Sequence, residues 1–271
     1  MVRQHGCRRA ARHWGWKVRI AGRPLKTLLA APVQRRHYVA FAGMVAAYPD
    51  FADVCGRYLL GRGDYPTSIR VRTPLGHAEI RVQSFHDLLT INEIFARRDY
   101  HTSGDIDVVV DIGSNIGISA LYFLTRNGGS KVFLFEPLPR NIDALKVNLE
   151  GYEARYVLHE VAVGTSDGMV EFGWEDTGRY GGVGRAGKHR LEVRCRDIDD
   201  VLREILREVG RIDLLKIDVE GSEEDLLRHA SPEHLRRIRT IYAECDGRRI
   251  ELPGFRHRQY GSVARFFNLQ A

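Results

Sequence analysis

The pattern of hydrophobic and polar residues divides the chain into two parts. In the first part, residues 37–61 are predicted to be helical, with a break at Pro49. A hairpin is predicted over 68–82, where apolar and polar residues alternate, and a short helix over 86–97. Beyond about residue 104, apolar strands alternate with amphipathic helices. We therefore expect a domain boundary at Thr102-Ser103-Gly104.

The second part has the pattern of a parallel sheet. Its predicted strands are apolar runs at 106–111, 131–135, 156–163, 212–217 and 240–243. The clearest helix covers 198–209, where six apolar residues recur at helical spacing. Ser222 and Asp225 predict a capping box at the start of a second helix. Ser231 before Pro232 predicts the N-cap of a third. Such alternation indicates a parallel sheet covered by helices on both faces.

Positive charge is concentrated at the N-terminus of this 271-residue chain, whose 44% hydrophobic and 28% charged residues are ordinary for a globular protein. Residues 1–36 contain ten of the 41 Lys and Arg residues and no acid, which leaves 31 basic and 35 acidic residues in the remainder. A basic arm of this kind suits an acidic membrane surface, a nucleic acid or another anionic partner. The alternative is a solvated tail.

The sequence also disfavours several classes of protein. No apolar run approaches the roughly 18 residues of a membrane-spanning helix, and the start has no clear secretory signal. The cysteines are scattered without a C-x-x-C pair, which argues against a zinc knuckle and a disulfide scaffold: Cys7, Cys55, Cys195 and Cys245. Free thiols suggest a reducing compartment, so we expect a cytoplasmic protein.

Carboxylates follow four of the predicted strands, at the edge of the sheet where doubly wound folds bind their ligands. They are Asp111, Glu136, Asp218 with Glu220, and Glu244 with Asp246. The loop D-I-G-S-N-I-G over 111–117 is rich in glycine but lacks the third glycine of a dinucleotide fingerprint. Asp111 also disfavours an anionic group there and favours a cationic one.

Glu136 stands 25 residues after Asp111, at the end of the second predicted strand. An acid in that position accepts hydrogen bonds from a ribose diol. Together the two residues describe S-adenosylmethionine, a nucleoside with an amino-acid tail and no phosphate. The alternative is that Asp111 only starts a helix and that Glu136 is a solvated strand end.

Four segments resemble the FkbM family of S-adenosylmethionine-dependent methyltransferases. They are V-V-D-I-G-S-N-I-G-I-S-A (109–120), F-E-P-L-P-R-N (135–141), A-V-G-T-S-D-G (162–168) and I-D-L-L-K-I-D-V-E-G-S-E (212–223). The resemblance covers roughly 68–245. It implies O-methylation of a hydroxyl on a sugar, a glycan or another natural product.

The resemblance also implies an architecture. Residues 105–271 would form a Rossmann-like class I methyltransferase domain, with a seven-stranded, mostly parallel sheet and an antiparallel hairpin over about 249–269. Residues 37–104 would cover the cofactor or acceptor side, and residues 1–36 would be the separate basic arm.

The implied cofactor contacts fall into three groups. The loop after the first strand would line the methionine end, through Asp111, Gly113, Ser114, Asn115 and Gly117. Glu136, followed by Pro137, would bind the ribose hydroxyls. Ala162 and Val163 would lie near the adenine.

Methyl transfer to an alcohol needs alignment of the reacting atoms and removal of the hydroxyl proton. A carboxylate base can take that proton, and our candidates are Asp218, Glu220 and Glu244. Asp218 and Glu220 would point to opposite faces of a regular strand, so both reach the site only if the chain turns there.

A metal ion is the alternative to a carboxylate base. A Mg²⁺ ion held by Asp218, Glu244 and Asp246 would lower the pKa of the hydroxyl. Alternatively, these carboxylates hold arginines or cap helices.

The glycine-rich segment 176–190 separates two strand-like runs, 169–173 and 191–195. A long loop inside a compact domain often forms a lid or a binding loop. Its side chains would suit a polyhydroxylated or anionic acceptor, through Arg179, Tyr180, Arg185, Lys188 and His189. The alternative is a surface loop without a binding role.

Other functional classes compete with the O-methyltransferase. A nucleic-acid methyltransferase would use the basic arm, but the basic residues are confined to the arm and the 176–190 loop, and no N-P-P-Y-type tetrapeptide follows the fourth strand. A non-enzymatic binding protein with a relict cofactor site is disfavoured by the intact loop, Glu136 and Asp218. A nicotinamide oxidoreductase is disfavoured by the missing third glycine.

Overall fold

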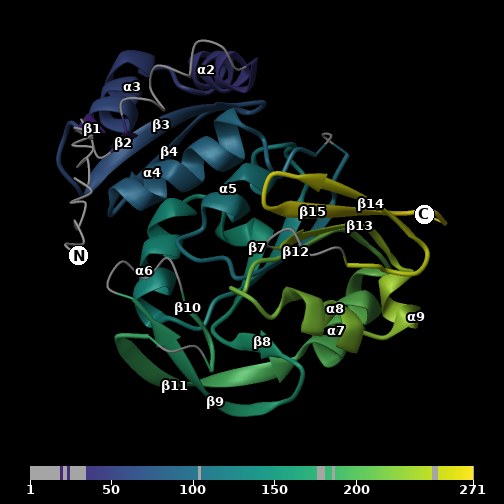
Figure 1. Ribbon diagram of the computed structural model, residues 1–271. Coiled ribbons are helices and arrows are strands. Elements are labelled where there is room, and N and C mark those ends of the chain that lie inside the picture. The colour runs from purple at the N-terminus through teal and green to yellow at the C-terminus, as the bar shows by residue number, and fades with distance from the viewer. Residues whose placement is uncertain are drawn as a thin grey trace, which may run out of the picture.

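The fold is centred on a seven-stranded sheet (Figure 1). The computed structural model describes residues 19–20, 23–24, 35–102, 105–175, 181–184, 187–245 and 250–270. The strands are β5 (Val108–Ile112), β6 (Lys131–Phe135), β7 (Tyr156–His159), β12 (Ile212–Ile217), β13 (Ile238–Glu244), β14 (Phe255–Tyr260) and β15 (Val263–Asn268). Their order in the sheet is β14-β15-β13-β12-β5-β6-β7.

The pairing within this sheet is parallel from β7 to β13 and antiparallel at the other end. β15 pairs antiparallel with both β13 and β14, so the C-terminal hairpin closes the sheet. This is the class I methyltransferase arrangement. The predicted fold class is therefore confirmed, including the antiparallel hairpin near the C-terminus.

Helices cover both faces of the sheet, as the alternation of strands and helices predicted. On one face lie α5 (Ile118–Leu124) and α6 (Pro139–Asn148), with the short η3 (Glu153–Arg155) after them; on the other lie α7 (Ile198–Val209), α8 (Glu223–His229) and α9 (Pro232–Leu235). Each face of the sheet has its own hydrophobic core, and successive side chains of β12 pack in one and then the other. Leu214 packs in the first, and Leu215 in the second.

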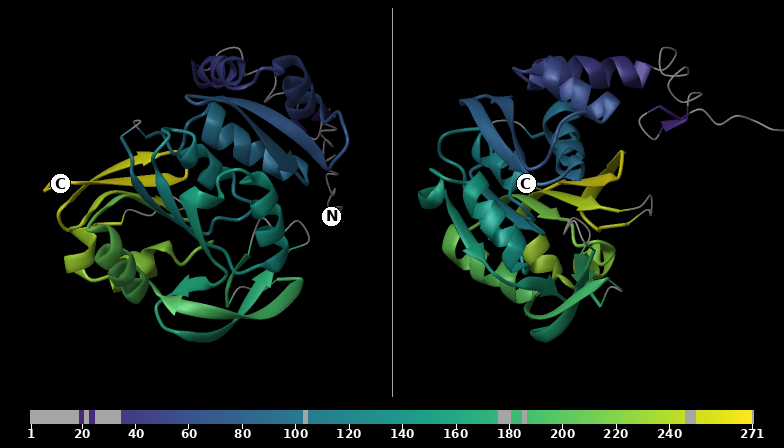
Figure 2. Two further views of the ribbon diagram at one scale, coloured as in Figure 1. Left: turned by 180° about the vertical axis from the view of Figure 1, so that it is seen from behind. Right: turned by 90° about the vertical axis from the view of Figure 1, so that its left-hand side faces the viewer.

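The N-terminal elements form a further layer outside α5 and α6, opposite the β8–β11 end of the molecule (Figures 1 and 2). They are α2 (Arg35–Ala47), α3 (Phe51–Leu60), the hairpin β3 (Thr67–Thr73) and β4 (Gly76–Val82), α4 (Phe85–Ile91) and the π-helix η2 (Asn92–Ala96), preceded by the two-residue strands β1 (Arg19–Ile20) and β2 (Arg23–Pro24). The predicted break at Pro49 is confirmed. Leu88 and Val109 belong to one hydrophobic core. The layer and the sheet thus share a core, and Ser103 and Gly104 of the expected boundary lie outside the described residues.

The predicted strand at 156–163 is wrong as a single element. It consists of β7 and a separate strand β8 (Ala162–Gly164), which pairs in parallel with β11 (His189–Asp197). β11, β9 (Gly168–Trp174) and β10 (Gly181–Val183) complete a second sheet of order β10-β9-β11-β8. The polar pair His159 and Glu160 marks the turn, but apolar residues on both sides of it contribute to hydrophobic cores, so the two short strands resembled one.

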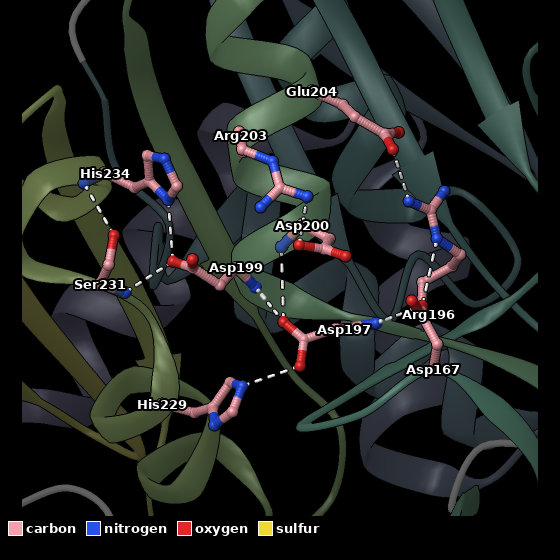
Figure 3. Close-up of polar contacts among 10 residues, drawn as sticks. All are labelled: Asp167, Arg196, Asp197, Asp199, Asp200, Arg203, Glu204, His229, Ser231 and His234. Atoms are coloured by element: carbon pink, nitrogen blue, oxygen red, sulfur yellow. Dashed lines mark hydrogen bonds and ion pairs between the residues drawn. The ribbon is translucent and has the colours of Figure 1, made fainter.

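Side chains at the N-termini of α7 and α9 connect the helices of the second face (Figure 3). The Asp197 carboxylate accepts a hydrogen bond from the Asp199 backbone amide at 2.8 Å and so caps α7. Its other oxygen lies 2.8 Å from His229 Nε2 at the end of α8. Asp199 Oδ1 lies 2.8 Å from His234 Nδ1 of α9. The Ser231 hydroxyl accepts from the His234 amide, which confirms the predicted N-cap.

The predicted capping box at Ser222 is not formed. Helix α8 does begin after Ser222, but the Ser222 side chain makes no capping hydrogen bond. The buried Glu223 carboxylate instead accepts from the backbone amides of Val219, at 3.0 Å, and Gly221, at 2.9 Å. The Glu223 carboxylate therefore holds the turn that follows β12 and does not replace the predicted cap of α8.

Two further findings concern membrane-spanning helices and the cysteines. Within the described part of the chain, no helix is both long enough and apolar enough to span a membrane. Cys55, Cys195 and Cys245 have free thiols. Cys7 lies outside the described residues, as does most of the basic arm.

Candidate active site

A cavity of about 640 Å³ lies at the carboxyl ends of the parallel strands. The segments that follow β5, β6, β12 and β13 form its floor. The N-terminal layer contributes Glu93 and Tyr100 to its wall, and the second sheet contributes Phe172, Gly181 and Val183. A pocket of this size, whose walls combine polar and apolar groups, suits a nucleoside-sized ligand together with part of an acceptor.

The loop after β5 presents its backbone to this cavity. The amides of Gly113 and Ser114 donate to the Phe135 carbonyl at 3.0 and 3.1 Å, so the loop folds back over the end of β6. Gly113 has a φ of +79°, and a Cβ there would lie 1.9 Å from the Asp218 carbonyl oxygen. Only glycine permits this approach. Gly113, Ser114 and Asn115 line the cavity, where the sequence placed them.

Asp111 and Gly117 lie behind the wall of the cavity. Asp111 is fully buried, and its Oδ2 accepts a hydrogen bond from Ser119 Oγ at 2.6 Å. Gly117 caps α5 at a φ of +85° and packs against Leu145. Neither residue lines the cavity. The structure thus gives the predicted contact of these two residues with the methionine end no support: they hold the loop, and Gly113, Ser114 and Asn115 face the cavity.

The partner of Asp111 is Lys216, which our sequence reasoning did not single out. Lys216 Nζ lies 2.9 Å from Asp111 Oδ1, 2.9 Å from the Gly113 carbonyl and 3.4 Å from Asp218 Oδ2. Burial lowers the pKa of Lys216, but the charges of Asp111 and Asp218 outweigh that effect and hold it above its ordinary value. The ammonium thus joins the β5 loop to the end of β12. A lysine in an otherwise apolar strand was the signal for this role.

Glu136 is 4% exposed and is held by the protein at both carboxylate oxygens. Oε2 accepts from the Asn115 amide at 2.9 Å, and Oε1 accepts from the Leu138 amide at 3.0 Å and from Asn141 Nδ2 at 3.2 Å. Burial raises the pKa of Glu136 to about 7 in spite of these hydrogen bonds. A carboxylate has about four acceptor positions, so one remains at Oε2 for a ligand hydroxyl. Pro137, the next residue, also lines the cavity.

An apolar slot lies beside Glu136. Ala162 and Val163 of β8, Leu138 and Phe172 all line the cavity, and all four are at most 8% exposed. Leu138 comes from the segment that follows β6, and the other three come from β8 and β9 of the second sheet. Such a surface fits a flat, apolar ring next to a group that binds Glu136.

Three candidate bases come together at the other end of the cavity. Asp218 and Glu220 both line it, because the chain leaves the strand after Ile217 and turns, with Glu220 at a φ of +61°. Glu244 reaches it from the end of β13. The charge of Asp218, followed by burial, raises the pKa of Glu244 to about 8. The turn after β12 removes the strand alternation that would have separated Asp218 from Glu220.

Tyr100 is a second cavity residue. It is among the residues that resemble the FkbM family, but our sequence reasoning gave it no role. It follows η2 in the N-terminal layer and is 2% exposed. Its hydroxyl donates a hydrogen bond to Glu244 Oε1 at 2.9 Å. The two residues stand 144 positions apart, so no local spacing in the sequence could have revealed this contact.

The predicted magnesium site has no support from the residues that the structure describes. Among them, no group of three or more His, Cys, Asp or Glu side chains is arranged to hold a metal ion. Asp246, the third of the predicted ligands, lies outside the described residues.

The predicted acceptor loop is described only in part. Arg179, Tyr180 and Arg185 lie outside the described residues. Lys188 and His189 do not line the cavity, and His189 at the start of β11 stacks on Trp174 with 5.5 Å between ring centroids. Strand pairing places His189 opposite Trp174, and an acceptor role for Lys188 and His189 stays a prediction. Gly181 and Val183 of β10 face the cavity instead.

Comparison with known proteins agrees with this architecture. Residues 111–264 match the family model of the methyltransferase FkbM domain. The 2-O-methyltransferase NoeI of Sinorhizobium fredii is 32% identical over 155 residues, which is 51% of this chain and 62% of that protein. The 31-O-demethyl-FK506 methyltransferase FkbM of Streptomyces tacrolimicus is 26% identical over 208 residues, 64% of this chain and 80% of that protein.

Among solved structures, methyltransferase FkbM from Methylobacillus flagellatus aligns with a TM-score of 0.43 and 16% identity. That alignment covers 68% of this chain and 54% of the Methylobacillus chain. The family model spans more than half of the sequence and includes the loop after β5, the end of β6 and the turn after β12. The chain belongs to the FkbM family of methyltransferases.

Proposed function

We propose that this protein is an S-adenosylmethionine-dependent O-methyltransferase that acts on a hydroxyl of a sugar, a glycan or another natural product. The observation that carries the proposal is one cavity with two chemically different ends. At one end, buried Glu136 lies beside an apolar slot. At the other end are Asp218 and Glu244. Family membership supports methyl transfer, and the names of two relatives, a 2-O-methyltransferase and a 31-O-demethyl-FK506 methyltransferase, support an oxygen acceptor.

The residues present fit the cofactor. Glu136 has one free acceptor position for a ribose hydroxyl, and Ala162, Val163 and Phe172 form a slot for the adenine ring. The backbone of 113–115 faces the space between Glu136 and Asp218, where the amino-acid portion would lie. Bound S-adenosylmethionine supplies an activated methyl group, so the protein has to position the acceptor and remove its proton.

Glu244 is the base that we propose. An alcohol is a weak nucleophile at neutral pH, and proton removal by a positioned group contributes about 10²–10⁴-fold to a rate. The neighbouring Asp218 charge raises the pKa of Glu244 to about 8, which brings the carboxylate closer in basicity to an alcohol than an ordinary glutamate is. Lys216 is bound to Asp111 and lies near Asp218. Its positive charge attracts both carboxylates and so holds this end of the site together.

The test of the cofactor is calorimetric titration with S-adenosylhomocysteine, with NADH titrated in parallel. We expect micromolar binding of S-adenosylhomocysteine and none of NADH. Binding of NADH alone, or of neither compound by protein with a cooperative thermal transition, would contradict the proposal.

The test of the reaction uses S-adenosylmethionine labelled in its methyl group and a panel of methyl glycosides of neutral and amino sugars. For an accepted glycoside, Glu244→Gln should lower kcat by about 10²-fold or more, because it removes the base. Its affinity for S-adenosylhomocysteine should change by less than about twofold. Glu160→Gln is the matched control, because Glu160 is 55% exposed in an ion pair with Lys146 and does not line the cavity. A Glu244→Gln enzyme with wild-type kcat would exclude Glu244 as the base.

A further inference from the structure

We propose that Tyr100 is the positioning residue of the active site: it fixes the Glu244 carboxylate and leaves Oε2 as the oxygen that meets the acceptor hydroxyl. The inference rests on the proposed function, since it assumes that Glu244 acts as a base. It gives the N-terminal layer a part in the chemistry, because Tyr100 comes from that layer and Glu244 from the central sheet.

The ring of Tyr100 is fixed on the sheet. It stacks on Tyr242 of β13, with 6.1 Å between centroids and 14° between ring planes. Lys216 Nζ lies 5.7 Å from the centroid of the Tyr100 ring. With 2% exposure, the side chain has little freedom to move. Its hydroxyl is therefore a donor with a fixed direction, as a positioning group must be.

The backbone on both sides of Tyr100 is also held. The Arg265 guanidinium of β15 donates to the Asp99 carbonyl at 2.6 Å and to the Arg98 carbonyl at 3.0 Å. The Tyr242 hydroxyl donates to the His101 carbonyl at 2.6 Å. These contacts fasten the segment that carries Tyr100 to β13, which ends at Glu244, and to β15, which pairs with β13.

The hydrogen bond from Tyr100 has a defined effect on the base. Burial raises the pKa of Tyr100 well above its ordinary value, so its hydroxyl stays protonated and donates. Glu244 is faced by Asp218 and Lys216 from the β12 side, and by Glu93 and Tyr100 from the N-terminal layer. Asp218 and Glu93 raise the pKa of Glu244, whereas Lys216 and the Tyr100 hydroxyl lower it. Loss of the Tyr100 hydroxyl should therefore raise the Glu244 pKa further and free its carboxylate to rotate.

The decisive experiment follows Glu244 directly, without cofactor or acceptor. Protein labelled with ¹³C at the glutamate side-chain carboxyl is titrated by NMR, and the Glu244 resonance is assigned by its loss in Glu244→Gln. Tyr100→Phe should raise the pKa of Glu244 by about one unit, the scale expected for a lost hydrogen bond to a charged group. Tyr156→Phe is the control, because it removes a hydroxyl from β7, which β12, β5 and β6 separate from the strand β13 that carries Glu244. It should leave the Glu244 titration where it is.

A second replacement keeps the test valid if Tyr100→Phe fails to fold. Replacement of Tyr100 by 3,5-difluorotyrosine retains the ring and makes the hydroxyl a stronger donor, so the Glu244 pKa should fall. Equal titrations of Glu244 in wild type and in the folded Tyr100 variants would overturn the inference. Failure of the proposed function would be seen separately, as absence of S-adenosylhomocysteine binding or of methyl transfer by the wild-type protein.

With an accepted glycoside, the pH profile gives a second readout. In Tyr100→Phe the rising limb of kcat should move to higher pH by the shift seen in the NMR titration, while KM for S-adenosylmethionine stays within about twofold. A uniform loss of kcat without a shift of the limb would indicate a structural role only and would contradict positioning.

Discussion

Lys216 Nζ lies 2.9 Å from Asp111 Oδ1, and neither side chain is more than 2% exposed. The pair connects β5, which carries Asp111, to β12, which carries Lys216. The Lys216 ammonium also donates a hydrogen bond to the Gly113 carbonyl. Removal of one member of such a buried pair leaves the other charge uncompensated, which is more costly than loss of the attraction alone.

Lys216→Met should lower the free energy of unfolding by about 3–5 kcal/mol, since Asp111 would then be buried without its counter-charge. The double variant Asp111→Asn with Lys216→Met should recover part of that loss, because neither charge remains. Urea denaturation of both variants measures the difference. With the Asp111→Asn single variant measured as well, a loss in the double variant equal to the sum of the two single losses would show that the two side chains are not energetically coupled.

Gly113→Ala should destabilise the protein and displace Asp218. It combines strain at a φ of +79° with a Cβ that would lie 1.9 Å from the Asp218 carbonyl oxygen. Gly151→Ala is the matched control, because Gly151 has a φ of +86° but a Cβ added there would meet no atom within 4 Å. We expect about 1–2 kcal/mol of strain in both variants and a further 1–3 kcal/mol from the clash in Gly113→Ala alone. Thermal or chemical unfolding that ranks the two variants equally would contradict the close approach.

Binding of S-adenosylhomocysteine should strengthen as the pH rises. Burial raises the pKa of Glu136 to about 7, and a ribose hydroxyl donates to the ionised carboxylate. Protonation at low pH removes that acceptor, so affinity should rise about tenfold between pH 6 and 8 and then level off. Calorimetry across this range, in buffers of different ionisation enthalpy, should also detect proton release near pH 7.

Variants separate Glu136 from other titrating groups. Glu136→Ala should weaken binding by about 1–3 kcal/mol and flatten its pH dependence. Glu244→Gln should keep the pH dependence. Wild-type affinity in Glu136→Ala would disprove the ribose contact.

Asp197→Ala should cost about 0.5–2 kcal/mol of stability, because it removes the N-cap of α7 and the contact with His229 at 2.8 Å. Asp200→Ala, in the first turn of the same helix, is the control. Asp200 forms an ion pair with Arg203 on the partly exposed surface, a type of contact worth about 0–1 kcal/mol. Chemical denaturation should therefore rank Asp197→Ala clearly below Asp200→Ala. The reverse order would show that the cap does not stabilise α7.

The sequence predicted those parts of the fold that follow from local pattern. Apolar strands alternating with helices placed β5, β6, β12 and β13 correctly, and four of the carboxylates predicted at their ends line the cavity: Glu136, Asp218, Glu220 and Glu244. The turn between β7 and β8 was missed, because both strands bury apolar residues. The capping box at Ser222 was also predicted wrongly: the Ser222 side chain makes no cap, and the neighbouring Glu223 carboxylate binds the Val219 and Gly221 amides of the preceding turn.

The parts of the site that could not be predicted depend on contacts between distant residues. Asp111 was expected to face the ligand, and only the three-dimensional structure shows Lys216 on its carboxylate. Tyr100 reaches Glu244 across 144 positions. An aspartate or a tyrosine can serve several roles in a site. In both cases the role is determined by a partner residue that comes from another strand or layer.

The second sheet has a consequence for how acceptor preference can change. In the described part of the chain, none of its strands pairs with the seven-stranded sheet, yet β10 and Phe172 of β9 form one wall of the cavity. Exchanges in β10 therefore alter this wall without disturbing the register of the strands that carry Glu136, Asp218 and Glu244. They also leave Ala162, Val163 and Phe172 of the proposed adenine slot in place, so β10 is the segment to exchange between relatives when the shape of the cavity is to be varied.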